Sequence, residues 1–546
     1  MIFNSIDFLI FFVIVYSLYC LLPFRWQNRM LLVASYIFYG WWDVRFLFLI
    51  ILSTSFDFSS GLMIKEGRLT NQQRLLPSMV VIMAALAFIT IRWEAVELSL
   101  HPLKLSIQWG QILPNQLSSW GVLISTLVAV ILANCLYPRL TRLNLTTRPK
   151  FCLILSVCGN LGLLGFFKYF NFFIGSISSI IQSFGAEPDF VYLHVILPVG
   201  ISFYTFQSMS YTIDIYRQKL EPTKHFFDFA LLVSFFPQLV AGPIERASHL
   251  LPQLTKPRHL QFEQSTRGLF LILFGLFKKV AIADSIAKSV NAIYNTRGSV
   301  SWADIVLATL LFTAQIYCDF SGYTDIARGV AKILGVELMT NFNLPYFSKT
   351  ASEFWQRWHI SLSTWLRDYL YIPLGGNRKG ELRTYINLMI TMILGGLWHG
   401  AAWNFVFWGL YQGILLCLYR YLENKLSIKG FSPFWNSVLA TFFFFILTCY
   451  GWLLFRANSL EQVVSFTTIL ITNVGDFNLS IPKPSLSGLL GLPVLIIYEI
   501  IENYFNNTHF YLRFRPVVKG AFYAILMTMI LMGVSNEPQQ FIYFQF

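Results

Sequence analysis

The sequence contains little charge. Only 12% of its 546 residues are Asp, Glu, Lys or Arg, roughly half of the share of about 25% in typical soluble domains. Hydrophobic residues make up 55% and aromatic residues 17%. Two or three soluble domains of this total length would need more polar surface, and a disordered chain would need fewer apolar residues. The remaining class is a polytopic membrane protein.

Several motifs of soluble enzymes are missing as well. None of the seven cysteines forms a CxxC pair, which excludes a zinc knuckle or redox motif of that type. The chain also lacks an HExxH pair and a GxSxG elbow, so neither a metal site nor a covalent serine mechanism is indicated. No internal repeat is evident, which weakens, without excluding, a transporter built from two related halves.

The net charge of +13 does not indicate nucleic-acid binding in this context. Basic residues collect in the cytoplasmic loops of membrane proteins. Here they cluster near 25–29, 65–74, 139–150 and 217–224, after alternate apolar runs. With those loops in the cytoplasm, the N-terminus and the loop at 93–118 face outward.

Apolar runs recur along the whole chain. An α-helix needs about 20 apolar residues to cross a bilayer, so the runs predict an all-α polytopic membrane protein. The first run, 8–22, lacks a cleavage site and is expected to be a retained anchor. The run at 384–420 can form two spans or one broken span. The other candidate spans are 29–41, 44–64, 78–92, 119–137, 151–175, 191–213, 226–241, 267–290, 302–320, 434–455, 486–502 and 516–534.

The segment 341–383 differs from its apolar flanks because it is rich in Trp and Arg. It is too polar for lipid, which favours helices packed in or across a protein-lined cavity. Helical spacing over 355–369 predicts one continuous helix that carries His359 and Trp358 on an aromatic face.

His399 lies inside the apolar run at 384–420, among glycines and tryptophans. An ionisable group at membrane depth is costly and suggests a functional site. A buried imidazole stays neutral and can accept a proton, as a general base for an alcohol must. A structural histidine bonded to a neighbouring helix explains the residue equally well. His359 is 40 residues away on a separate segment, so spacing alone does not show that the two converge.

Three further polar groups have two interpretations each. Asp319, Ser321 and Tyr323 lie at the end of the apolar stretch 302–320; they can line a polar channel, but structural support of a helix break is favoured. Arg378, Lys379 and Arg383 flank a glycine turn that lacks phosphate-loop spacing; a solvated basic cap is favoured over contact with a phosphorylated donor. Glu245 and Arg246 either pair with other groups at a re-entrant turn or belong to a plain interfacial turn.

The motifs together resemble the membrane-bound O-acyltransferase (MBOAT) family. The likeness is to its bacterial branch, which includes alginate O-acetyltransferase membrane subunits and the D-alanyl transfer protein of teichoic acids. It covers most of 1–460, whereas 461–546 is expected to add further transmembrane helices. The motifs that carry it are RWHISLSTW (357–365), YIPLGG (371–376), LWHGA (397–401), MIFNS (1–5), FYGWW (38–42), FQSMSYTID (206–214) and FPQLVAGPI (236–244).

The resemblance implies a ring of transmembrane and re-entrant helices around a central tunnel. It implies His399 as the catalytic base and His359 as the second catalytic residue. The expected tunnel residues are Trp358, Trp365, Trp398, Trp403, Asn404, Ser321, Tyr323 and Asp319, with Arg378, Lys379 and Arg383 on the donor side.

The expected function is transfer of an acyl group, namely acetyl, from a cytoplasmic thioester to a hydroxyl of an envelope polysaccharide or a relay protein. Acyl-CoA, namely acetyl-CoA, or an acyl carrier protein would be the donor, with no permanently bound cofactor and no metal. The expected partners are an extracytoplasmic polysaccharide acetylation protein and membrane lipid, in the bacterial cytoplasmic (inner) membrane. Two alternatives remain: D-alanyl transfer to teichoic acid from a carrier protein, and a non-enzymatic transporter or flippase.

Overall fold

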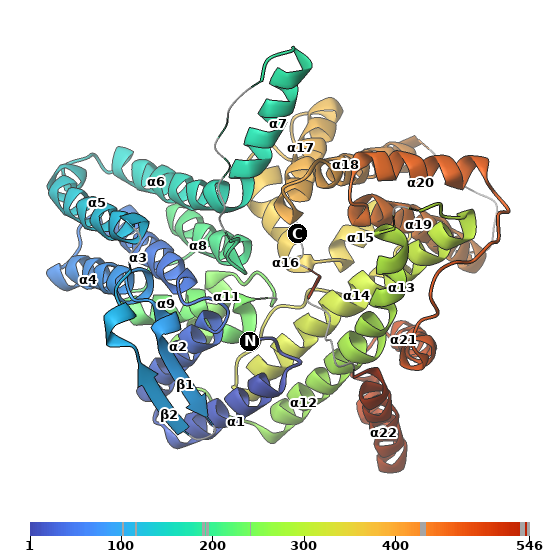
Figure 1. Ribbon diagram of the computed structural model, residues 1–546, viewed down its shortest axis with the longest axis horizontal. Coiled ribbons are helices and arrows are strands. Elements are labelled where there is room, and N and C mark those ends of the chain that lie inside the picture. The colour runs from blue at the N-terminus through green and yellow to red at the C-terminus, as the bar shows by residue number, and fades with distance from the viewer. Residues whose placement is uncertain are drawn as a thin grey trace. The chain divides into compact units, whose positions relative to one another are not determined.

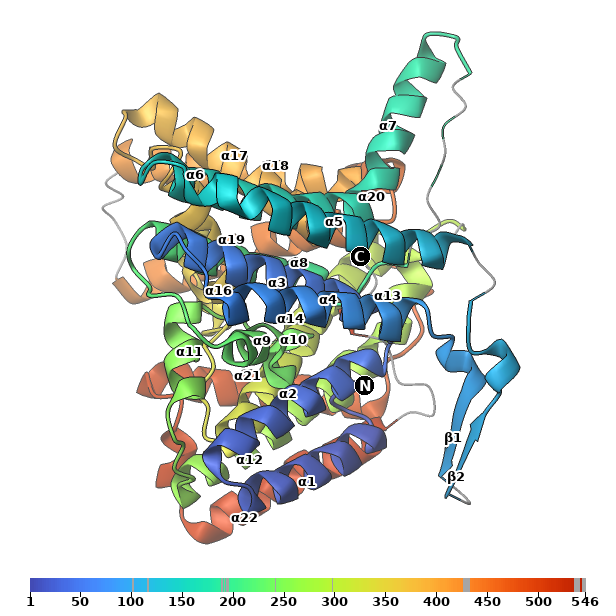
Figure 2. The same cartoon turned by 90° about the vertical axis from the view of Figure 1, so that its left-hand side faces the viewer.

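The computed structural model describes the chain except for residues 101–102, 115–116, 188–189, 191, 193–195, 241, 297, 426–432, 535–540 and 543–546. The chain forms two compact units, which Figures 1 and 2 show as ribbons. Unit 1 comprises Met1–Val240, Ile244–Gln261 and Leu334–Leu338. Unit 2 comprises Ala241–Pro243, Phe262–Ile333 and Met339–Phe546. This division is one of contacts, so the boundary expected at residue 460 stays a prediction.

The described residues form an all-α polytopic membrane protein, as predicted. Nine of their helices are long and apolar enough to cross a membrane. They are Phe46–Lys65, Asn71–Ile89, Leu117–Thr141, Thr147–Ser183, Trp302–Ile333, Trp403–Glu423, Ser437–Arg456, Leu486–Phe505 and Pro516–Gly533.

Among the described residues of unit 1, the regular structure is helical apart from one hairpin in the predicted outer loop, which the sequence did not suggest. Its strands β1 (Val96–Leu100) and β2 (Leu103–Ile107) pair antiparallel, with Val96 opposite Ile107. The helices are α1 (Ile6–Leu21), α2 (Phe24–Gly40), α3 (Phe46–Lys65), α4 (Asn71–Ile89), η1 (Trp93–Ala95), η2 (Trp109–Gln111), α5 (Leu117–Thr141), α6 (Thr147–Leu164), η3 (Gly165–Tyr169), α7 (Phe170–Ser183), α8 (Ile201–Tyr216), α9 (Phe226–Ser234), α10 (Phe236–Leu239) and α11 (Ala247–Thr255).

Helix α3 is the buried centre of unit 1, and in Figure 2 it runs beside α4 and α6. Its Asp57 is fully buried, and its carboxylate accepts hydrogen bonds from Ser156 Oγ at 2.6 Å and Asn160 Nδ2 at 2.8 Å, both in α6. A buried carboxylate is costly unless hydrogen-bonded. These contacts therefore fix how α3 and α6 face each other.

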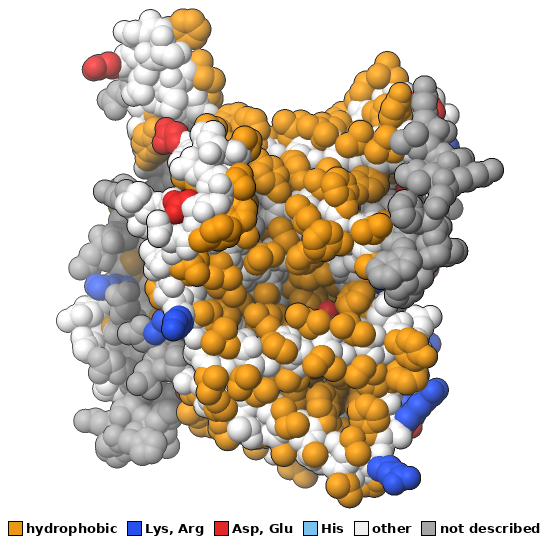
Figure 3. Space-filling view, turned by 90° about the vertical axis from the view of Figure 1, so that its right-hand side faces the viewer, with side chains coloured by type: hydrophobic (Ala, Val, Ile, Leu, Met, Phe, Trp, Pro, Cys, Tyr) orange, Lys and Arg blue, Asp and Glu red, His pale blue; other side chains and the backbone are white. Residues whose placement is uncertain are grey.

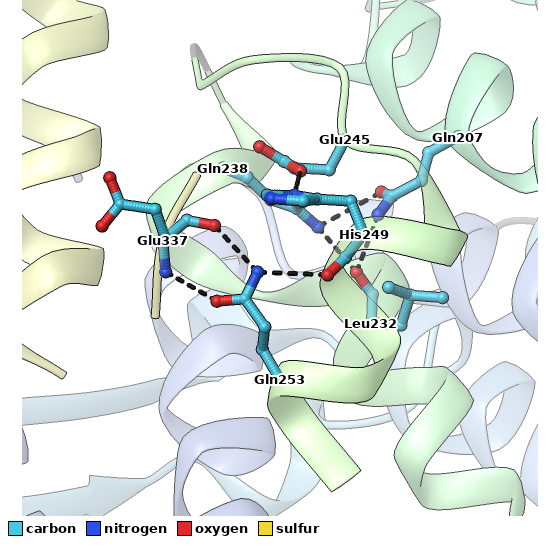
Figure 4. Close-up of polar contacts among 7 residues, drawn as sticks. All are labelled: Gln207, Leu232, Gln238, Glu245, His249, Gln253 and Glu337. Carbon is cyan, nitrogen blue, oxygen red and sulfur yellow. Dashed lines mark hydrogen bonds and ion pairs between the residues drawn. The ribbon is translucent and has the colours of Figure 1, made fainter. Parts of the chain in front are cut away.

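The span predicted at 226–241 is wrong, because this stretch folds into the short buried helices α9 and α10 instead. The chain leaves helical geometry at Phe235, and the next turn begins with Pro237 near its start. The break frees the carbonyl of Leu232, which accepts from Gln207 Nε2 at 3.1 Å and Gln238 Nε2 at 2.6 Å (Figure 4). Broken helices persist in a membrane protein where side chains satisfy the freed backbone groups.

In the turn that follows, Glu245 pairs with His249. A pairing of this kind belongs to the first of the two interpretations given for this segment. The Glu245 carboxylate is buried and lies 2.8 Å from His249 Nδ1, one helical turn along α11 (Figure 4). In the same view, Gln253 Nε2 donates to the Glu337 carbonyl at 3.0 Å, and Glu337 N donates back to Gln253 Oε1 at 2.8 Å. These bonds anchor the short segment Leu334–Leu338 within unit 1.

Unit 2 contains the segments that carry both candidate histidines. Its helices are α12 (Phe262–Leu276), η4 (Phe277–Asp284), α13 (Ser285–Tyr294), α14 (Trp302–Ile333), η5 (Pro345–Phe347), α15 (Ala351–Arg357), α16 (Ile360–Leu366), η6 (Arg367–Tyr371), α17 (Glu381–His399), α18 (Trp403–Lys425), α19 (Pro433–Arg456), α20 (Leu460–Thr472), α21 (Leu486–Phe505), η7 (Phe510–Arg513) and α22 (Pro516–Gly533).

Helix α14 runs well beyond the predicted span at 302–320, so the expectation of a helix break around 319–325 is wrong. Its polar residues lie inside the helix because the π-helical turn η4 supplies matching cations. Lys279 Nζ lies 2.7 Å from Asp319 and 2.8 Å from Asp284, and Lys278 Nζ lies 2.5 Å from Asp325. Paired, hydrogen-bonded charges are the form in which ionisable groups are tolerated in a membrane interior.

The run at 384–420 forms two helices, one of the two predicted outcomes. Helices α17 and α18 pack closely where Gly396 faces Gly409. A methyl group on Gly396 would lie 2.2 Å from the Phe405 carbonyl oxygen, and one on Gly409 would lie 2.4 Å from the Met392 carbonyl oxygen. Only glycine permits backbones to approach so closely.

One face of the structure is largely apolar, as a lipid-facing surface must be. Figure 3 shows hydrophobic side chains spread over one face, with Lys and Arg at its margins. Exposed residues of α21 and α22 contribute, among them Ile496, Ile497, Ile525 and Leu531. The chain is therefore a multi-pass integral membrane protein.

Candidate active site

His359 lies at a break between two short helices, so the continuous helix predicted over 355–369 is wrong. Helix α15 ends before Trp358, which is extended, and His359 has the left-handed angles φ 42° and ψ 53°. Helix α16 begins at the next residue. Its first amides are taken by Asn341: the Asn341 carbonyl accepts from Ile360 N at 2.9 Å, and Asn341 Oδ1 accepts from Ser361 N at 3.2 Å.

His399 is the last residue of α17 and lies close to His359. The two ring centroids are 6.2 Å apart, and the rings are inclined by 56°. His359 is 0% exposed and His399 is 4% exposed. Two histidines 40 positions apart in the sequence thus share one buried site.

Aromatic side chains surround the histidine pair. Trp398 lies 5.8 Å from the His359 ring and 5.1 Å from the His399 ring. Trp408 and Phe455 meet His399 edge-on at 5.2 and 5.5 Å, and Phe320 meets His359 edge-on at 4.7 Å. Sequence analysis missed the last three. The only signal for Trp408 was its place nine residues after His399 in the same apolar run.

The other predicted tunnel tryptophans lie in different surroundings. Trp358 packs on Trp452 at 4.7 Å and on Phe342 at 5.0 Å. Trp365 packs on Tyr369 at 5.0 Å. Trp403, at the start of α18, is 48% exposed.

The predicted polar tunnel residues serve largely to anchor structure. The amide of Asn404 donates to the Ala457 carbonyl at 3.0 Å. Besides its pairing with the Lys279 ammonium, Asp319 accepts from Ile542 N at 2.8 Å. Tyr323 stacks on Phe541 at 4.5 Å, and Ser321 is buried. The contacts of Asp319 and Tyr323 hold the part of α14 that carries Phe320, whose ring meets that of His359.

Burial sets the charge state of His359, which belongs to none of the candidate spanning helices. Desolvation lowers the pKa of its imidazole to about 3. The ring is therefore neutral at physiological pH, with one nitrogen able to donate and the other able to accept. A neutral ring can donate a hydrogen bond to a carbonyl oxygen without carrying a charge into the site.

A cavity of about 500 Å³ opens between the short helices and the α17–α18 pair. Polar side chains on its wall include Gln356, Thr364 and Arg367. Trp355 lines it and packs on Trp408 at 5.9 Å, and Trp408 in turn packs on His399. Two indole rings thus lie between the cavity and the catalytic candidate.

The basic turn lies at the other end of α17 from His399. Arg378, Lys379 and Arg383 are all exposed. The turn is fixed to α17 because Asn387 Nδ2 donates to the Gly376 carbonyl at 2.9 Å, and Gly376 itself has φ 55°. Tyr371, just before the turn, lines the cavity. No group of three or more His, Cys, Asp or Glu that could hold a metal ion occurs in the part of the chain that the structure describes.

These features define an integral membrane protein with a buried histidine pair, and comparison with known proteins identifies its family. The model of the MBOAT, membrane-bound O-acyltransferase family, matches residues 218–460. The "Probable alginate O-acetylase AlgI" of Azotobacter vinelandii is 37% identical over 506 residues, which cover 92% of this chain and 85% of that protein. The chain belongs to the MBOAT family and is an O-acyltransferase.

Other relatives are named for different substrates. The "Peptidoglycan O-acetyltransferase" of Helicobacter pylori is 39% identical over 341 residues, 58% of this chain and 63% of that protein. The "Teichoic acid D-alanyltransferase" of Bacillus subtilis is 28% identical over 275 residues, 48% of this chain and 69% of that protein.

Proposed function

We propose that this enzyme moves an acetyl group from acetyl-CoA to a hydroxyl of an envelope polysaccharide, directly or through a relay protein. The observation that carries the proposal is the buried pair His359 and His399 at 6.2 Å. The relatives named for alginate and peptidoglycan acetylation support acetyl as the group and a glycan as the acceptor.

His399 is the general base in the proposed mechanism. It accepts the proton of the acceptor hydroxyl as that oxygen attacks the thioester carbonyl carbon. The carbon–sulfur bond then breaks, and the proton passes from His399 to the leaving thiolate, so the products are the ester and the free thiol. His359, held neutral by burial, donates a hydrogen bond to the carbonyl oxygen as negative charge develops there.

The aromatic shell contributes by holding the reactants and excluding water. Trp398 contacts both histidine rings, and Trp408 and Phe455 cover His399. Exclusion of water strengthens the hydrogen bonds made in the transition state and suppresses hydrolysis of the thioester. Trp358, Trp365 and Trp403 remain proposed walls of the substrate path.

The cavity beside α17 is the proposed donor site. It extends from Tyr371, near the basic turn, to Trp355, next to the indole that covers His399. A thioester arm can lie in it with its reactive end toward the histidines. Arg378, Lys379 and Arg383 would then meet the phosphate groups of the donor at the cytoplasmic face.

The expected setting is the bacterial cytoplasmic (inner) membrane, with an extracytoplasmic acetylation protein as partner. The teichoic acid relatives favour a second function, D-alanyl transfer from a carrier protein. The greater coverage and identity of the alginate O-acetylase make acetyl transfer the first choice.

The test measures label transfer from radiolabelled acetyl-CoA to alginate and to peptidoglycan in membranes that carry the enzyme. We expect His399→Ala to lose at least 1,000-fold in rate, on the order of the loss when a general base acts within a catalytic unit. His359→Ala should lose less. His249→Ala is the matched control, because His249 is half-exposed and belongs to unit 1. Transfer by the His399 variant at the wild-type rate would refute the assignment, and label accepted only from a D-alanyl carrier would favour the second function.

A further inference from the structure

The left-handed conformation of His359 needs an explanation. Its φ of 42° is unusual for a residue other than glycine. Such conformations persist only where the surroundings fix them, and they cluster at functional sites. The local sequence favours the opposite outcome, since its apolar spacing suits one unbroken helix from 355 to 369.

Asn341 supplies the contacts that impose the break. It is 0% exposed, and it is joined to α16 by two acceptors: its main-chain carbonyl takes Ile360 N, and its side-chain Oδ1 takes Ser361 N. Two residues further on, Asn343 N donates to the Arg357 carbonyl at 3.0 Å. The segment 341–343 is thus hydrogen-bonded to the chain on both sides of His359.

The Oδ1 contact is the part that depends on side-chain identity. The first amides of a helix have no partner inside the helix. In many helices the side chain of the preceding residue caps these amides. Here the preceding residue is His359, whose imidazole lies among the site's aromatic rings. Asn341 performs the capping from 18 residues away, and the His359 side chain makes no cap bond to α16.

We propose that Asn341 is the positioning residue of the active site: it caps α16 in place of His359 and so holds the His359 imidazole toward His399. This inference rests on the proposed role of His359. Without the Oδ1 acceptor, Ser361 N loses this hydrogen bond, and the chain can relax toward the unbroken helix that its sequence favours. In that helix the side chain of His359 would point in a different direction.

The experiment is a double-mutant cycle in the full-length enzyme. Native membranes that hold equal amounts of each variant receive labelled acetyl-CoA, and ester-linked label on envelope polymer is counted. The variants are Asn341→Ala, Asn341→Asp and Asn343→Ala, the first also combined with His359→Ala. Asp keeps an acceptor oxygen at a helix N-terminus, where a carboxylate is favourable. Asn343 is exposed and serves as the matched control.

We expect Asn341→Ala to reduce the maximal rate at least tenfold, with the half-saturating acetyl-CoA concentration unchanged within twofold. Asn341→Asp should recover to within threefold of wild type, and Asn343→Ala should match wild type. In the His359→Ala background, Asn341→Ala should cause no further loss, because Asn341 acts only by positioning the imidazole that this background lacks.

Two results would overturn the inference. One is a loss from Asn341→Ala that persists at full size in the His359→Ala background, which would make Asn341 independent of His359. The other is an Asn341→Asp variant that is as slow as Asn341→Ala while remaining equally abundant, which would exclude the capping oxygen. A His359→Ala variant with the wild-type rate, by contrast, would refute the proposed role of His359 itself, and an inactive wild type would refute acetyl-CoA as the donor.

Discussion

The contact between α17 and α18 offers a sharp test of how backbone packing sets the catalytic geometry. A methyl group at Gly396 would lie 2.2 Å from the Phe405 carbonyl oxygen, whereas ordinary contacts of this kind begin at 3.4 Å. The two helices must therefore separate locally by about 1 Å in Gly396→Ala. His399 is three residues further along α17, and its neighbour Trp408 is on α18, so the shift occurs inside the site.

A misplacement of about 1 Å can reduce a catalytic rate on the order of 100-fold, which corresponds to about 2.7 kcal/mol in the barrier. We expect a loss of that size in the rate of acetyl transfer, measured in membranes together with the unfolding midpoint in detergent. Gly162→Ala in α6 is the matched control, because a methyl group there meets nothing within 4 Å. A Gly396→Ala enzyme within twofold of wild type would show that the close approach does not set the geometry.

Three further predictions concern ionisable groups. Burial lowers the pKa of His359 to about 3, so between pH 3 and 6.5 the unfolded chain binds more protons than the folded protein. The free energy of unfolding should therefore rise with pH across that window, and it should rise less in His359→Asn. His249 behaves oppositely, because its hydrogen bond to Glu245 raises its pKa above 6.5. The stabilisation from this pair is complete below pH 6.5 and is lost as the pH rises through the raised pKa. Glu245→Gln should remove that loss from the pH profile of the unfolding midpoint. Lys279→Met leaves two buried carboxylates without their cation and should cost about 3–5 kcal/mol in unfolding free energy, whereas Lys288→Met, on the exposed face of α13, should change it by less than about 0.5 kcal/mol.

The sequence was sufficient for the class of fold and for the two candidate histidines, because both depend on local composition. Runs of about 20 apolar residues predict spanning helices directly. An ionisable residue such as His399 inside such a run is conspicuous for the same reason. The burial and proximity of the pair, however, come from tertiary packing that no spacing rule encodes.

The failures share one physical cause, which is that a distant group overrides the local pattern. The break at His359 depends on Asn341, and the break after Ser234 depends on Gln207. Helical periodicity over a short window cannot include such partners. The π-helical turn η4 is similar, because Lys278 and Lys279 inside an apolar run are explained only by carboxylates from α14.

Contacts across residue 460 give the C-terminal helices a part in the site. Tyr317 Oη donates to Glu499 Oε1 of α21 at 2.5 Å, and Ile542 N donates to Asp319. Tyr317 and Asp319 lie just before Phe320 in α14, and the ring of Phe320 meets that of His359. The match to the family model ends at residue 460, yet the far side of His359 is held by residues beyond it. The C-terminal segment therefore supports the part of α14 next to the proposed site, and variation there can reach His359 through Phe320.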